Sequence, residues 1–272
     1  MLFDLRGKRK RLVQVIYAAL ALLFGGGFIL FGIGSEGGGG LFDGLGLGDG
    51  GNGGSTAEPF IEEAENIEVK LRRTPDDEEL LARLVRARYN AGLAQLEVDS
   101  ETGQQSISSE SAEEFELAGE AWKRYARLEP SEPNIVAAQS ASRALFAASQ
   151  TAATAAEFSE AVTAAAEAQA VVATERSSLA TYFELAQLRY FAGDFEGGDE
   201  AADQAKAQVP KAQRRNVEDQ LESLRKQGQG LQKHLKASQQ AEGQQSLESL
   251  ENPLGGLSGG GLGAGGFSQS AP

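Results

Sequence analysis

The sequence has no cysteine, and histidine, methionine and tryptophan each occur once among its 272 residues. Without cysteine the chain has no disulfide, no thiolate nucleophile and no sulfur ligand for a metal. Its one histidine, His234, lies in a polar stretch of Gln, Lys and Ser. Phosphate-binding loops and nucleophile elbows are also missing from the sequence. We therefore expect no enzyme activity, no cofactor and no metal site.

Basic residues are outnumbered, and the formal net charge is −14. Binding to a nucleic-acid backbone needs clustered Lys and Arg, so an acidic chain of this kind is not expected to bind nucleic acid. The carboxylates gather at expected helix starts such as Asp76 to Glu79 and Glu113-Glu114, where they compensate the positive end of the helix dipole. Their distribution therefore indicates helix stabilisation rather than a substrate site.

β-branched residues are sparse in the middle of the chain, where alanine and glutamate dominate. This composition favours helix over strand, and the sequence predicts an all-α protein. Most of the 34 glycines lie in residues 25–54 and 255–266, outside this middle part. The folded region is therefore expected to be shorter than the chain.

The N-terminal region combines a basic segment, residues 1–11, with an uncharged apolar run, residues 12–34. At about 1.5 Å per residue this run spans roughly 34 Å, enough for a hydrocarbon core of about 30 Å. The basic flank places residues 1–11 in the cytoplasm and the bulk of the chain outside the cell membrane. The alternative is a signal peptide cut after Gly32-Ile33-Gly34, which would release the rest as a secreted module. Ala21 and Gly25 have the spacing of small residues at which two such helices pack together.

The remaining chain divides into four segments. Residues 35–58 form a Gly-rich flexible linker, 59–210 a helical domain, 211–242 a polar capping helix, and 243–272 a disordered tail rich in Gly, Ser and Gln. Within the helical domain, Thr74, Ser111 and Ser131 are the expected N-caps of successive helices. Residues 97–110 are expected to be a long polar loop. The apolar stripe of the capping helix, interrupted by Gly228 and Gly230, is expected to close the end of the domain or to contact a partner helix.

A repeated motif organises the helical domain. Arg189-Tyr-Phe-Ala-Gly193 repeats Arg88-Tyr-Asn-Ala-Gly92, with Leu185 and Leu84 at the same offset. The two copies are about three 34-residue periods apart, which is the period of helix–turn–helix solenoids. The stretch from Leu179 to Pro210 predicts two helices joined by a tight turn at Ala192-Gly193-Asp194.

These residues resemble the tetratricopeptide repeat (TPR) family. Tyr182-x2-Leu185-Ala186, Gly193 and Pro210 match its first helix, turn and end, and Ala118-x3-Trp122 followed by Pro130 matches its second helix. Where the family has a tyrosine, this chain has Arg88 and Arg189, each followed by a tyrosine. The resemblance covers roughly residues 76–210 and implies a TPR-like solenoid of about three repeats.

The resemblance also implies a groove, lined by the first helix of each pair, that holds a protein or peptide. A Lys/Asn clamp for a peptide carboxylate, known in some family members, is not present, because Ala82, Arg86 and Ala180 occupy several of its places. For Tyr190, two roles stay open: contact with a ligand, or packing against the neighbouring helix. The implied groove residues are Ala82, Arg86, Tyr89, Asn90, Phe183, Gln187, Tyr190 and Phe191.

Taken together, these features predict a single-pass membrane protein that holds other proteins on the extracytoplasmic side. One anchor followed by a TPR domain is similar to the layout of the ancillary subunit of the bacterial secretion translocon, which implies a role in secretion or envelope protein folding. Two alternatives stay open: an envelope component that self-assembles through its anchor or its 211–240 helix, and the secreted module released by signal cleavage.

Overall fold

The computed structural model describes residues 56–98 and 105–251, and within these ranges the chain is all-α apart from one short ribbon. The predicted anchor, nearly all of the predicted linker and residues 252–272 of the predicted tail lie outside the described residues. None of the described helices combines the length and the apolar character that a membrane crossing requires. The helices are α2 (Glu58–Leu71), α3 (Glu78–Ala94), α4 (Ser109–Ala126), α5 (Ile135–Ser149), α6 (Ala155–Glu175), α7 (Leu179–Ala192), α8 (Phe195–Ala207) and α9 (Lys211–Glu251).

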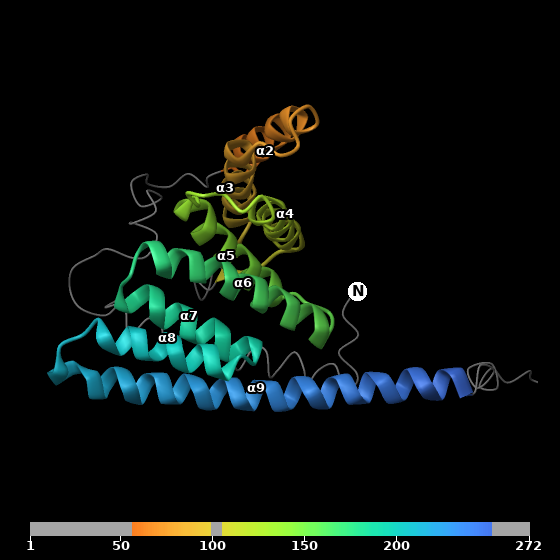
Figure 1. Ribbon diagram of the computed structural model, residues 1–272. Helices are drawn as coiled ribbons and strands as arrows, with labels where there is room; N and C mark the ends of the chain where they lie inside the picture. The colour runs from red at the N-terminus through yellow and green to blue at the C-terminus, as the bar shows by residue number, and fades with distance from the viewer. Residues whose placement is uncertain (1–55, 99–104, 252–272) are drawn as a thin grey trace, which may run out of the picture.

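The helices form a stack that runs from α9 at one end to α2 at the other (Figure 1). Each helix packs against the next one in the chain, and in addition α3 lies against α5 and α7 against α9. By contrast, no Cα atom of α5 comes within 8 Å of one in α7. The two parts of the stack are joined through α6, which packs on α5, α7 and α9.

Most helices start at a side-chain cap. In each case a side-chain oxygen of the N-cap residue accepts a hydrogen bond from the backbone N–H three residues later, which satisfies a group that the helix leaves unpaired. The predicted caps at Thr74, Ser111 and Ser131 are wrong, and each true cap lies one helical turn away. The observed caps are Asp77, Ser108, Asn134, Thr154, Ser178 and Asp194.

The predicted polar loop at 97–110 contains a short antiparallel ribbon. Strand β1 (Glu97–Val98) pairs with β2 (Gln105–Ser106), with Glu97 opposite Ser106 and Val98 opposite Gln105. The helix after the ribbon begins at Ser109, earlier than the sequence suggested.

Helix α9 is longer and more continuous than predicted. It runs through Gly228 and Gly230 without a break and reaches Glu251 rather than residue 242. A Cβ atom on Gly228 would lie 2.6 Å from the backbone oxygen of Tyr190, so glycine permits α9 to approach α7 closely. The predicted apolar stripe packs against the stack, with Val217, Leu221, Leu231 and Leu235 all buried.

Candidate functional site

Most of the implied groove residues lie in the core. Tyr190 is 1% exposed and Phe191 2% exposed, and the ring of Tyr190 stacks on Phe195 of α8 at 6.2 Å between centroids. For Tyr190 the packing role is therefore the one the structure shows. The physical reason is close packing by α8 and α9: Gly198 of α8 lies against the Tyr190 ring, and Gly228 of α9 lies against the Tyr190 backbone. The buried members of the set are Ala82, Tyr89, Phe183, Tyr190 and Phe191.

Three implied groove residues meet solvent. Arg86 is exposed, whereas Asn90 and Gln187 are partly exposed. Three further residues that the resemblance did not single out are also partly exposed: Arg143 and Phe146 on α5, and Glu184 on α7. We call this set the first-helix face; it consists of Arg86 and Asn90 on α3, Arg143 and Phe146 on α5, and Glu184 and Gln187 on α7.

Arg143 connects the three helices of this face electrostatically. Burial raises the pKa of the Tyr89 hydroxyl on α3, while the positive charge of Arg143 acts in the opposite direction. Burial likewise raises the pKa of the Glu184 carboxyl on α7, and Arg143 again lowers it. The Glu184 carboxylate also accepts a hydrogen bond from Gln169 Nε2 of α6 at 3.0 Å. Polar groups on α3 and α7 therefore lie within electrostatic reach of the Arg143 guanidinium on α5.

The α5 members of the face could have been found from the sequence. In the Ala- and Ser-rich helix from Ile135 to Ser149, the large residues Gln139, Arg143 and Phe146 recur at spacings of four and three, which places them on one side of a helix. Large side chains on one side of an otherwise small-residue helix indicate a surface that faces solvent or a partner. The motif search missed them because this pair has no recognisable repeat signature.

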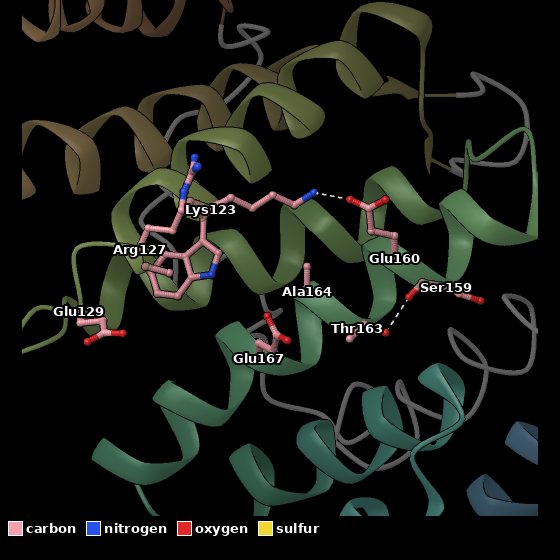
Figure 2. Close-up of a pocket in the computed structure, with 10 residues that line it drawn as sticks. Lys123, Arg127, Glu129, Ser159, Glu160, Thr163, Ala164 and Glu167 are labelled. Carbon is pink, nitrogen blue, oxygen red and sulfur yellow. Dashed lines mark hydrogen bonds and ion pairs between the residues drawn. The ribbon is translucent and has the colours of Figure 1, made fainter. Parts of the chain in front are cut away.

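A recess lies between α4 and α6, which both pack against α5. We call it the α4–α6 groove. It has a volume of about 840 Å³, and Figure 2 shows side chains of both helices pointing toward it. The groove is bordered by the apolar residues Trp122, Ala126 and Ala164, which lie among charged residues. Its full lining is Trp122, Lys123, Ala126, Arg127, Glu129, Ser159, Glu160, Thr163, Ala164 and Glu167.

The two sides of the groove differ in charge. The α4 side carries Lys123 and Arg127 together with Glu129 just past the helix end, whereas the α6 side carries only acids, Glu160 and Glu167. Lys123 Nζ crosses to Glu160 Oε1 at 2.7 Å (Figure 2). The hydrogen bond from Lys123 holds the pKa of the Glu160 carboxyl below its usual range. Both side chains are largely exposed, so this ion pair contributes little to stability.

In the part of the chain that the structure describes, no three His, Cys, Asp or Glu side chains gather as metal ligands would. The polar groups of both places are instead spread along helix surfaces, an arrangement suited to binding a polypeptide. No protein-family model, curated protein or solved structure matches the chain.

Proposed function

We propose that this protein is a membrane-anchored, TPR-like adaptor that holds another protein on the extracytoplasmic side of the cell membrane. The helix pairs would act as about three TPR-like repeats, and residues 12–34 would be the anchor. The bound partner would lie on the first-helix face. No catalytic step is part of this proposal.

The observation that carries the proposal is the convergence of α3, α5 and α7 on Arg143. Arg143 of α5 acts electrostatically on Tyr89 of α3 and on Glu184 of α7, and each of these helices has side chains at least partly exposed to solvent while its other side is filled by core residues. A surface built from several repeats, each contributing a few side chains, suits an extended polypeptide better than a small molecule.

The chemistry of the first-helix face suggests the composition of the ligand. Arg86 and Arg143 supply two positive charges against the single carboxyl of Glu184, Asn90 and Gln187 supply both donors and acceptors, and Phe146 supplies a partly exposed apolar ring. Arg side chains recognise carboxylates through planar, two-pronged hydrogen bonds. The ligand is therefore a segment with acidic and apolar side chains.

The binding proposal can be tested by site-specific photo-crosslinking in intact membranes. A photoreactive residue in place of Asn90 or Gln187 should give the same crosslinked partner, whereas one in place of Gln204, exposed on α8, should not. Arg143→Glu should weaken binding of that partner at least about tenfold, which corresponds to 1.4 kcal/mol. Lys233→Glu, at an exposed position of α9, is the matched charge control. Equal crosslinking from Gln204, or no effect of Arg143→Glu, would contradict the proposal.

The location of the protein needs a separate test. Protease added to intact spheroplasts should digest the helical domain but leave residues 1–11 protected, and the mature N-terminus should keep the mass of the uncleaved chain. A mature N-terminus shortly after Gly34 would instead support the secreted module. A role in secretion or envelope protein folding is an extension that depends on the identity of the crosslinked partner.

A further inference from the structure

The two terminal helices of the stack each leave one side uncovered by the other described helices. Among these helices, α2 packs only on α3, and α9 packs on α6, α7 and α8. Figure 1 shows α2 and α9 at opposite ends of the stack. The sides that face away from the stack are mostly polar, as the ends of a helical-repeat domain require. Their charges follow a pattern that this requirement does not explain.

The outer side of α2 carries an acidic block followed by a basic one. Four exposed residues recur at spacings of four, three and four on the side opposite the core: Glu58, Glu62, Glu65 and Val69. Three exposed basic residues end the helix and begin the next turn: Lys70, Arg72 and Arg73. The ion pairs between α2 and α3 use other acids, Glu63 and Glu68, so the three outer acids have no cation within 4 Å among the described residues.

The outer side of α9 carries the two charges in the same order. Beyond the basic first turns of the helix, three acids come first: Glu218, Asp219 and Glu222. From residue 223 to residue 240 there is no further acid, and the exposed lysines are Lys226, Lys233 and Lys236. Lys226 Nζ contacts Glu222 Oε1 of its own helix at 2.6 Å, whereas the other two lysines have no carboxylate within 4 Å among the described residues.

Because the order of charge is the same on both helices, an antiparallel contact between them brings opposite charges together. Glu62 and Arg73 are eleven residues apart, and so are Glu222 and Lys233. At about 1.5 Å per residue both separations are roughly 16 Å. The acidic block of either helix can therefore face the basic block of the other, whereas a parallel contact would set like charges together. The pattern thus selects a second copy as the partner and also the direction of its helix.

We propose that the outer side of α9 in one copy binds the outer side of α2 in a second copy, with the two helices antiparallel. Glu62 then lies opposite Lys233. At the other end of the contact, Arg73 lies opposite Glu222. Val69, 51% exposed, lies between these pairs, where the aliphatic stems of lysines can cover it. Because the two surfaces differ, the contact is heterologous, and copies join head to tail into a ring or an open row.

A contact between exposed charges is weak and depends on salt. Exposed ion pairs contribute at most about 1 kcal/mol each, and dissolved ions screen them. Copies anchored in one membrane would meet at a high effective concentration, so the anchor of the proposed function would strengthen the contact without being required for it. Assembly should therefore be strongest at low ionic strength.

The absence of cysteine allows the direction of the contact to be tested with introduced disulfides. For the full chain in detergent micelles, oxidation of Glu62→Cys/Lys233→Cys should give a ladder of covalent dimers and larger species on a non-reducing gel. The matched control, Glu62→Cys/Glu222→Cys, should stay monomeric, because the antiparallel contact holds its cysteines roughly 16 Å apart and a disulfide needs Cα atoms within about 7 Å. A ladder from the control, or none from the first pair, would overturn the proposal.

Charge reversal tests the contact without a covalent bond. Glu62→Lys/Glu65→Lys changes only α2, and Lys233→Glu/Lys236→Glu changes only α9; all four residues are exposed. By sedimentation velocity at low salt, the unchanged protein should form larger assemblies as its concentration rises. Each reversal should raise the dissociation constant at least about tenfold. Both reversals in one chain put opposite charges together again and should restore assembly.

The combined variant separates this contact from misfolding and from other modes of association. A fold damaged by one reversal would not recover when the second is added, and association through the anchor would respond to neither. Circular dichroism should show the same helix content in all variants. If either reversal assembles like the unchanged protein, or if the combined variant stays monomeric, the proposal is wrong. None of the changed residues belongs to the first-helix face, so failure here leaves the adaptor proposal untouched.

Discussion

The two copies of the Arg-Tyr-x-Ala-Gly motif have the same letters but different structural roles. In the first copy Arg88 is almost wholly buried, and its guanidinium contacts carboxylates on both neighbouring helices. Arg88 Nη2 donates to Glu68 Oε1 of α2 at 2.7 Å, and Nη1 donates to Glu114 of α4 at 3.0 Å. Burial disfavours the charged guanidinium and lowers its pKa. The hydrogen bonds to Glu68 and Glu114 outweigh this effect, so the pKa of Arg88 is raised. This arginine therefore connects three helices through a triad in which Arg88 and Glu114 are buried and Glu68 is partly exposed.

In the second copy Arg189 stays within its own helix pair. Its Nη1 donates to the backbone oxygen of Gly197 at 2.8 Å, and its ion-pair distances to Asp194 and Glu200 are long, 3.9 and 3.8 Å. Its side chain is 27% exposed, against 9% for Arg88. Arg189 thus supports a turn that already has its own cap, whereas Arg88 neutralises two acids.

The glycines of the two motifs differ in the same way. Gly92 lies inside α3, which continues to Ala94, and a Cβ atom there would come 2.6 Å from the Phe115 ring. Gly193 ends α7 with a φ of 89°, in the left-handed region that glycine adopts without strain. The difference follows from the next residue, because Asp194 caps α8 at once, whereas Leu93 continues the first helix. One short motif can therefore mark either a close helix contact or a helix end.

The largest expected difference between the motifs concerns the arginines. Arg88→Met should cost about 3–5 kcal/mol of unfolding free energy, because it leaves two carboxylates without their partner, one of them buried. Arg189→Met should cost about 1 kcal/mol, the value of an ordinary hydrogen bond. Urea unfolding of the full chain in detergent micelles, followed by circular dichroism and by the fluorescence of Trp122 on α4, measures both. Adding Glu114→Gln should recover part of the first loss; equal losses for the two arginines would refute the comparison.

The glycines should differ in how a substitution can be rescued. Gly92→Ala overpacks the contact with Phe115 and should cost about 1–3 kcal/mol. Adding Phe115→Leu removes the ring and should make the alanine nearly neutral. Gly193→Ala forces a Cβ atom into the left-handed region, at about 1–2 kcal/mol. Adding Gln232→Ala removes the nearest side chain but not this strain, so little should be recovered. Thermal unfolding of the single and double variants decides between packing and backbone strain.

Whether a structural feature could be predicted from the sequence depends on how far apart along the chain the residues that determine it lie. The helix pair at Leu179–Ala207 and the turn at Gly193 were predicted, because a cap, a glycine and a periodic stripe are local signals. The caps at Asp77, Ser108 and Asn134 were each missed by one turn, because another Ser or Thr, three residues away, offered the same local chemistry. In two of these cases the wrongly predicted cap residue donates a hydrogen bond to another helix instead. The Thr74 hydroxyl donates to Lys70 O of α2, and the Ser111 hydroxyl donates to Gly92 O of α3.

Features that depend on packing between distant segments were not visible. A resemblance assigns residues to a groove by position in the repeat, but whether Tyr190 is exposed depends on the close approach of Gly198 to its ring and of Gly228 to its backbone. The open α4–α6 groove likewise depends on how far apart two helices lie. The first-helix face was recovered in part, since Arg86, Asn90 and Gln187 remain at its surface while Arg143 supplies its centre.

A smaller difference concerns the tyrosine hydroxyl of the second motif. Tyr190 donates to Asp199 Oδ1 at 2.9 Å, and Asp199 also binds Arg225 of α9 at 2.9 Å. Tyr190→Phe should therefore cost about 1 kcal/mol. Combining it with Asp199→Ala should cost less than the sum of the single changes, because both remove the same hydrogen bond. A fully additive double variant would show that the hydroxyl contributes through another group.

The smallest effect should come from Glu184, which contrasts with the acids around Arg88 because no cation lies within 4 Å of it among the described residues. Burial raises its pKa above the unfolded value, so the folded state holds its proton more tightly. Stability from this group is therefore lost as the pH rises from the unfolded pKa through the raised folded one.

Glu184→Gln removes that cost at neutral pH and can still accept the hydrogen bond from Gln169. It should raise the thermal midpoint by about 1–2 °C at pH 7. The gain should vanish below about pH 4, where the carboxyl is protonated in both states. Gln187→Glu, on the same exposed side of α7, is the matched control and should show no such gain. A gain that persists in acid would mean that the amide stabilises α7 through packing, and the contrast with the triad at Arg88 would then not be one of charge.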